Sequence, residues 1–394
     1  MNREQLFVKA PAVEQRDPEA FGDTAELGRS PLEDYVVHEL PADLRAVDEG
    51  SMTRQQLAEK QAGMLTDTWP QISQNLDPHT AKSTHLDFLF MLGGYIPAGA
   101  DMYRSAPPML LSLIGAQCDR FRGLRPYMTY EMIVDYNAEE YRRTGAVRVY
   151  ADGDDGLHER DFYLGHHAAE PYAKAAAYGL HTLAERPDQV NATATLQTVV
   201  TNLNEFRRFM GAYTRLPRST FAYFRQYLAG YADGTRNASG AFMPSVQLLE
   251  LALLAPTEMY GVYLDESRPY FPDWSVPVIE DWRIASASGM NVEDRVATGS
   301  LALDEQGRTA LADAINQFLH FRTTHLGITK AQIPDAFTST AGLDKGSIGR
   351  SRVEQQILDP AYKGTAGFDV RNVLTNSVVR LANLRRRLGF ESEF

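Results

Sequence analysis

The chain is almost devoid of cysteine, with Cys118 as the only one among 394 residues. A single thiol cannot form a disulfide within the chain, build a cluster of thiolate metal ligands or supply the paired cysteines that attach a haem covalently. The sequence therefore excludes these three kinds of site. A chain without disulfides suits a reducing compartment, and we expect a cytoplasmic protein.

Long apolar runs and excess positive charge are also missing. The first residues lack the basic, apolar and small-residue pattern of a secretion signal, and no apolar run approaches the length that crosses a bilayer. Acidic residues (51) outnumber basic ones (39), and the formal net charge of -12 would repel nucleic-acid phosphates. We expect neither a membrane nor a nucleic acid as partner, and the sequence leaves a homo-oligomer open.

The residues that are present have an ordinary globular composition. Hydrophobic residues make up 44% of the chain, which is enough to bury a large core. The N-terminal region, residues 1–84, is polar, and prolines such as Pro31 and Pro41 predict extended or loosely packed structure before short helices near 55–66. Apolar density then rises. The sequence predicts a mainly α protein with a helical domain at 85–394.

Residues 311–330 contain no proline and, before Gly327, no glycine, which predicts a helix of several turns. Arg322 would face inward with the apolar residues of that helix. A buried guanidinium needs an anionic partner, because removing its charge from water costs several kcal/mol. One explanation is an internal salt bridge beside a hydrogen-bonded core histidine. The other is a haem, whose iron takes a neutral imidazole and whose propionates take a guanidinium. Steps of three and four residues place on one face Ile315, Phe318, Arg322, His325 and Thr329.

Two short segments carry a resemblance to a known family. Residues 321–326, FRTTHL, and 346–349, GSIG, resemble the Arg-x-x-His-Leu segment and the glycine-rich loop of indoleamine 2,3-dioxygenase, tryptophan 2,3-dioxygenase and the pyrrolnitrin-pathway enzyme that rearranges chlorotryptophan. The loop departs from the pattern at Ile348, where a glycine is usual. The resemblance implies a helical haem-binding domain of the indoleamine 2,3-dioxygenase type, with His325 as the metal ligand on a haem b. Arg322 and Gly346 would also contact the cofactor.

Residues 217–231, PRSTFAYFRQYLAGY, resemble the family segment Pro-x-x-x-Phe-x-x-x-Arg-x-Tyr-Leu-x-Gly-Trp. Phe221, Arg225 and Leu228 share a helical face, so the cation points in the same direction as its apolar neighbours. A buried structural ion pair would explain this pattern. The resemblance instead implies that Arg225 binds the carboxylate of an amino-acid substrate and that Phe221 also contacts this substrate. Ser347 is the residue expected near the substrate ammonium group.

A third segment, residues 126–134, resembles the family's Pro-x-x-x-Tyr-x-x-x-Val stretch, which lines the substrate pocket. Tyr130, Ile133 and Val134 fall at helical spacing and therefore on one face. Ordinary core packing is the alternative explanation. The resemblance implies that these three side chains contact the substrate.

Residues 161–186 form an alanine-rich stretch that predicts a helix interrupted or started at Pro171. His166 shares its stripe with apolar and small residues, whereas the stripe of His167 continues into Glu170 and Lys174, which we expect in water. His166 is therefore expected to face inward. A hydrogen-bonded core histidine would do so too. The resemblance implies a catalytic histidine on the distal side of haem, with His167 as the alternative.

His85 and Asp87 offer a different metal chemistry, since His-x-Asp is the spacing of a facial-triad iron site. That site usually lies on strands, and the apolar run after Asp87 favours a core helix.

The resemblance implies a haem-dependent monooxygenase or dioxygenase that uses O2 or peroxide to oxidise the ring of tryptophan, tyrosine or a derivative. Three alternatives remain: the pyrrolnitrin-type rearrangement, a haem-binding or ligand-binding protein without turnover, and a helical protein without haem.

Overall fold

The computed structural model describes residues 29–74, 78–121, 123–188, 190–332 and 370–390. Those residues are mainly α-helical and contain no strand, which confirms the mainly α prediction. No helix in the described part of the chain is long and apolar enough to cross a membrane.

The helices follow one another with short connections. In chain order the α-helices are α1 (Glu33–His38), α2 (Leu40–Asp48), α3 (Arg54–Gln74), α4 (Pro78–Gly93), α5 (Met102–Ser105), α6 (Pro108–Arg120), α7 (Asn137–Thr144), α8 (Gly153–Glu185), α9 (Ala192–Met210), α10 (Arg218–Arg225), α11 (Pro244–Leu253), α12 (Glu258–Ser267), α13 (Ser275–Ala287), α14 (Val292–Ala297), α15 (Glu305–Gln332) and α17 (Val370–Arg387). Short 3-10 or π turns separate them: η3 (Ile96–Asp101), η4 (Met132–Tyr136), η5 (Gly211–Arg215), η6 (Gln226–Leu228), η7 (Gly240–Phe242) and η8 (Arg268–Tyr270).

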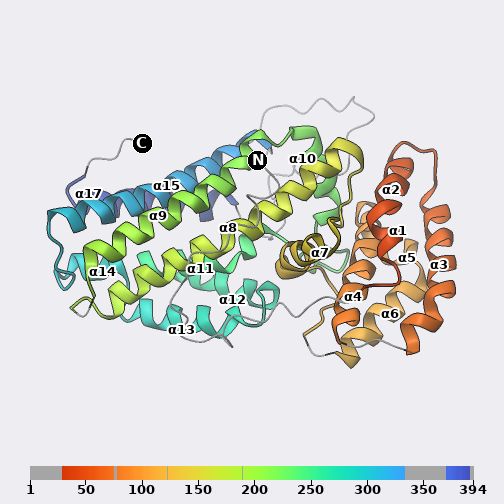
Figure 1. The fold of residues 1–394 in the computed structure, drawn as a ribbon, viewed down its shortest axis with the longest axis horizontal. Coiled ribbons are helices and arrows are strands. Elements are labelled where there is room, and N and C mark those ends of the chain that lie inside the picture. The colour runs from red at the N-terminus through yellow and green to blue at the C-terminus, as the bar shows by residue number, and fades with distance from the viewer. Residues whose placement is uncertain (1–28, 75–77, 122, 189, 333–369, 391–394) are drawn as a thin grey trace.

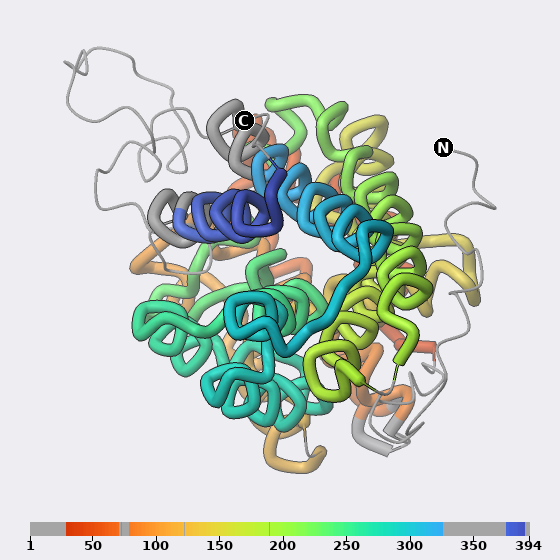
Figure 2. The backbone as a smooth tube through the Cα atoms, turned by 90° about the vertical axis from the view of Figure 1, so that its left-hand side faces the viewer, coloured from red at the N-terminus to blue at the C-terminus, as the bar shows by residue number. Residues whose placement is uncertain are grey.

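The helices α8, α9, α15 and α17 run along the length of the molecule, and α1 to α6 gather at one end (Figure 1). α9 packs against both α8 and α15, and α17 lies on α15, whereas α11 packs against α8. The end view in Figure 2 shows α15 between α17 and α9, with α11 to α14 below α15 and α17. Small residues make the close approach to α8 feasible: Ala169, Ala173 and Ala177 are fully buried.

The N-terminal region is better packed than the sequence predicts. The expectation of loose structure is wrong for residues 30–50, which form α1 and α2 and bury Val36 and Leu40 completely. Pro41 does not break α2, because it lies in the first turn, where the missing N–H is not needed. The expected boundary between residues 84 and 85 falls inside α4.

The helix around the two histidines is longer than predicted, because α8 begins at Gly153 and continues through Pro171 without interruption. The helix predicted over residues 311–330 is confirmed as part of α15.

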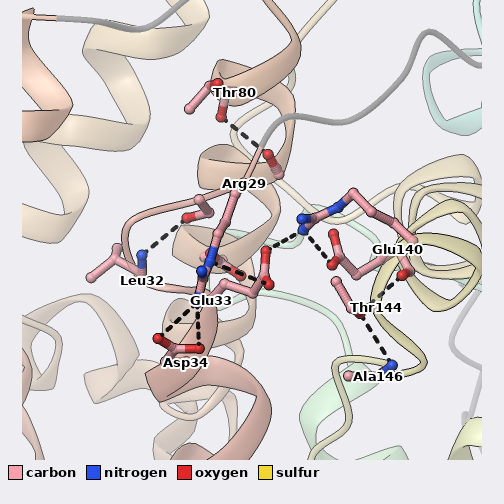
Figure 3. A network of polar contacts seen from close by, with 12 residues as sticks. Arg29, Leu32, Glu33, Asp34, Thr80, Glu140, Thr144 and Ala146 are labelled. Carbon is pink, nitrogen blue, oxygen red and sulfur yellow. Dashed lines mark hydrogen bonds and ion pairs between the residues drawn. The ribbon is translucent and has the colours of Figure 1, made fainter.

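An ion network ties α1 to α4 and α7. The Arg143 guanidinium lies 2.5 Å from both the Glu33 and the Glu140 carboxylates, and Glu33 also faces Arg29 (Figure 3). The network continues through Arg148, which lies 3.5 Å from Glu140 and pairs with Asp87, and the Arg148 and Asp87 side chains are fully buried. Charges removed from water in this way need partners, so the network fixes how the N-terminal helices sit on the rest of the protein.

Candidate functional site

Three of the expected site residues lie close enough to His325 to lower its pKa. His325 on α15 is half-buried, and its pKa falls to about 4, first because of burial and then because of the nearby Arg322, His166 and Arg225 side chains. These come from α15, α8 and α10, and α10 packs against both other helices. His325 is therefore a neutral imidazole near pH 7, the form that can bind a metal.

Arg322 already has an anionic partner. Its Nη2 lies 2.5 Å from Oε2 of Glu250 on α11, and the Ser377 hydroxyl of α17 donates to the same oxygen at 3.0 Å. This is the internal salt bridge that the sequence offered as one explanation for a buried cation. Arg322 Nε is buried and has no hydrogen-bond partner among the described residues, so one donor is left for another acceptor.

His166 faces inward, as its helical phase predicts, and is 5% exposed. Its Nδ1 lies 2.9 Å from the Phe162 carbonyl oxygen and 2.9 Å from the Tyr213 hydroxyl, and its ring stacks on that of Tyr213. Burial lowers the pKa of His166 to about 4, so this imidazole is neutral too. A Cβ on Gly240 would lie 3.2 Å from Nε2, so this nitrogen faces the start of η7.

His167 is half-buried, and its Nδ1 lies 2.9 Å from the Asp135 carboxylate. The expectation that its stripe faces water is wrong. Glu170 accepts hydrogen bonds from the backbone and hydroxyl of Ser245, and burial followed by repulsion from Asp135 raises the pKa of Glu170 to about 7. η4 and α11 cover this stripe, which its sequence alone does not reveal.

Arg225 and Phe221 lie on α10, and both are half-buried. The guanidinium carbon is 5.3 Å from the centre of the Phe221 ring, a cation–π contact. The Phe221 ring is in turn 6.1 Å from that of Phe162, which contacts His166 at 4.6 Å. A continuous line of aromatic side chains therefore connects Arg225 with His166.

Tyr130, Ile133 and Val134 are buried, at most 3% exposed. The ring of Tyr130 meets that of His166 edge-on at 6.1 Å, and its hydroxyl has no hydrogen-bond partner in the part of the chain that is described. Met132–Tyr136 is a π turn, η4, so the regular α-helical spacing assumed from the sequence does not hold there. Such turns are frequent at functional sites.

Some expected residues lie elsewhere. Gly346 and Ser347 are outside the described residues. His85 bonds to the Gln117 side chain and the Arg125 carbonyl, while Asp87 pairs with Arg148, so their partners are separate. Over residues 29–74, 78–121, 123–188, 190–332 and 370–390 no group of three or more His, Cys, Asp or Glu side chains could hold a metal ion.

The sequence did not identify Tyr213 or Glu250 as part of this region. Tyr213 lies 47 residues from His166, and Glu250 lies 72 residues from Arg322. A buried arginine signals that an acid must be near it, but not which one.

No protein-family model and no curated protein sequence matches the chain.

Proposed function

We propose that the protein is a haem-dependent oxygenase that acts on an aromatic amino acid. The observation that carries the proposal is the convergence of His325, His166 and Arg225 from three helices into one electrostatic neighbourhood, with both imidazoles neutral. A neutral imidazole suits a haem iron, and an arginine beside an aromatic ring suits a carboxylate attached to a ring.

His325 is the proposed metal ligand on a haem b. The lowered pKa favours ligation near neutral pH, since no proton has to leave the ring. Bound haem would supply the activation of O2 or peroxide. Arg322 fits less simply: Glu250 neutralises its charge, and its buried Nε is a donor that could reach a propionate. Gly346 belongs to the proposal through sequence resemblance alone.

The substrate residues are proposed around the aromatic line. Arg225 would bind the carboxylate and Phe221 the adjoining ring. Tyr130, Ile133 and Val134 would pack on the aromatic part, because they are buried and Tyr130 contacts the catalytic candidate His166. Ser347 is proposed for the ammonium group by resemblance. The substrate is tryptophan, tyrosine or a derivative, and ring oxygenation is preferred over the pyrrolnitrin-type rearrangement.

A second candidate function is a ligand-binding protein without oxygenase turnover. The Arg322–Glu250 pair favours it, because the buried cation is neutralised without any cofactor.

An absorbance spectrum separates the two candidates. The full chain, expressed with haem supply and purified, should show one Soret band, which moves when tryptophan or tyrosine is added. Turnover should appear on reduction in air or with peroxide. A haem-free protein that binds aromatic amino acids supports the second candidate. A haem protein whose spectrum and turnover ignore both amino acids contradicts the substrate half of the proposal.

A further inference from the structure

The segment that follows Arg225 is bonded to α2, a helix of the N-terminal region. Arg225 is the last residue of α10, and Gln226 and Tyr227 are the first two residues of η6. Both donate to the same oxygen of the Asp48 carboxylate, the Gln226 Nε2 at 3.1 Å and the Tyr227 hydroxyl at 2.7 Å. Asp48 is the last residue of α2. The residues next to the proposed carboxylate-binding arginine are therefore bonded to a distant part of the sequence.

The same helix also reaches the start of α10. Arg45, one turn before Asp48, pairs with Asp152 and lies 3.7 Å from Asp155 at the beginning of α8. Asp155 in turn accepts a hydrogen bond from the hydroxyl of Thr220, a fully buried residue of α10. α2 therefore supports α10 at both ends, directly through Asp48 and by way of α8 through Arg45.

Tyr227 connects this exposed carboxylate with the core. Its side chain is 1% exposed, and its ring stacks on that of Tyr150 at 4.9 Å, which stacks on Phe90 of α4 at 4.8 Å. Burial, followed by the neighbouring Tyr223 and Asp48 side chains, raises the pKa of Tyr227, so the hydroxyl keeps its proton and donates. A hydrogen bond from a phenol to a carboxylate is of the stronger, charge-assisted kind. Asp48 itself is exposed, so its replacement leaves no cavity in the core.

These contacts matter because α10 is short. A helix of eight residues is not stable on its own, so tertiary contacts decide its direction. A guanidinium donates two parallel hydrogen bonds to a carboxylate only when the two planar groups are aligned. A ring that packs on Phe221 tolerates small displacements better, since the burial of apolar surface has no direction. Loosening η6 should therefore weaken the binding of the carboxylate more than that of the ring.

We propose that Asp48 positions Arg225 for the substrate carboxylate by holding η6 in place. Tyr227 and Gln226 transmit the effect, and Asp48 is a positioning residue, since it acts through Arg225. Its role in substrate binding rests on the proposed function, whereas the hold of α2 on α10 concerns this chain alone. α2 thereby becomes part of the amino-acid site, although the resemblance assigns no residue of the N-terminal region to the substrate.

Hydrogen exchange tests the hold of α2 on α10 without haem or substrate. In the full chain, the backbone amides of residues 218–228 should exchange about three- to tenfold faster in Asp48→Ala, and in Tyr227→Phe, which keeps the ring and removes only the hydroxyl. Glu49→Ala is the matched control, because it removes the same charge from the neighbouring exposed residue. Unchanged exchange in both test variants, or equally fast exchange in the control, overturns the proposal.

A double-mutant cycle tests whether Asp48 acts through Arg225. With haem bound, Asp48→Ala alone should raise the Kd of tryptophan or tyrosine about three- to tenfold, and Glu49→Ala should leave it unchanged. In an Arg225→Leu background, Asp48→Ala should add little, because the group that it positions is gone. Additive losses, or no loss in Asp48→Ala, overturn the positioning role. If the wild type binds neither amino acid, the proposed function fails, and the exchange rates still decide whether α2 holds α10.

Discussion

The Arg322 guanidinium lies 2.5 Å from the Glu250 carboxylate and joins α15 to α11, with the Ser377 hydroxyl of α17 on the same oxygen. Both charged side chains are at most 9% exposed. The ion pair therefore holds three helices beside the proposed haem ligand, and its loss should be felt in stability as well as in any cofactor contact.

Glu250→Gln should lower the free energy of unfolding by about 3–5 kcal/mol, because it leaves the Arg322 charge buried without its anion. Denaturant unfolding of the haem-free chain measures this. The matched control is Glu250→Leu combined with Arg322→Met, which removes both charges and should recover most of the loss. A single variant within about 1 kcal/mol of wild type would mean that the pair contributes little.

Arg225→Leu should raise the Kd of tryptophan or tyrosine at least about tenfold, since a charge-assisted pair to a carboxylate is worth about 1.5–3 kcal/mol. Arg225→Lys should lose less, because the charge stays while the two-pronged geometry goes. Titration of the absorbance or calorimetric change gives both constants. Equal affinity of wild type for tryptophan and tryptamine, or for tyrosine and tyramine, speaks against the assignment.

His166→Ala should leave the haem content near that of wild type and lower turnover by about 100-fold or more, the usual contribution of an acid–base group. His167→Ala should change neither, because that side chain bonds to Asp135 and lies on another face of α8. Haem content and initial rates are compared in the two variants. The reverse pattern, with His167 essential and His166 dispensable, would exchange their roles.

Glu159 gives a pH prediction outside the proposed site. This carboxyl is fully buried beside Tyr163 and the Tyr150 and Ala151 amides, and burial raises its pKa from 4.5 to about 7 despite those hydrogen bonds. Between these values the folded state binds a proton that the unfolded state has released. The contribution of Glu159 to stability is therefore complete below pH 4.5 and declines as the pH rises toward 7, by about 3 kcal/mol at most.

The check is the free energy of unfolding of wild type minus that of Glu159→Gln, measured from pH 4 to 8. Taking the difference matters because the lowered pKa values of His166 and His325 act in the opposite direction, adding stability as the pH rises from 4 to 6.5. A difference that stays constant, or grows with pH, contradicts the raised pKa of Glu159.

Local patterns predicted the parts of the fold that depend on local physics. The helix α15 is long and contains no proline, so its sequence was sufficient to predict it. Pro41 led to the wrong prediction of loose structure. A proline breaks the interior of a helix but is favourable in its first turn, and the sequence does not show that α2 begins at Leu40.

In the candidate site, too, local sequence predicted some features, whereas tertiary packing determined the others. The helical phase of α8 predicted that His166 faces inward. The sequence also predicted that a buried Arg322 would need an acidic partner. The identities of Glu250 and Tyr213 were not predicted, because they reach the site from distant elements. The covering of the His167 stripe by η4 and α11 is likewise a product of tertiary packing, which overrides the polarity of one helix face.

The measurement that tests the central claim most directly is the haem content of His325→Ala beside that of His158→Ala, an exposed histidine on α8. Both variants are expressed with haem supply, purified as folded protein and assayed by the Soret band and by extracted haem per chain. The account predicts near-stoichiometric haem in wild type and His158→Ala and loss of most haem in His325→Ala, with imidazole added to the medium restoring part of it. Full haem occupancy with an unchanged ferrous spectrum in His325→Ala, or no haem in the wild type, would contradict it.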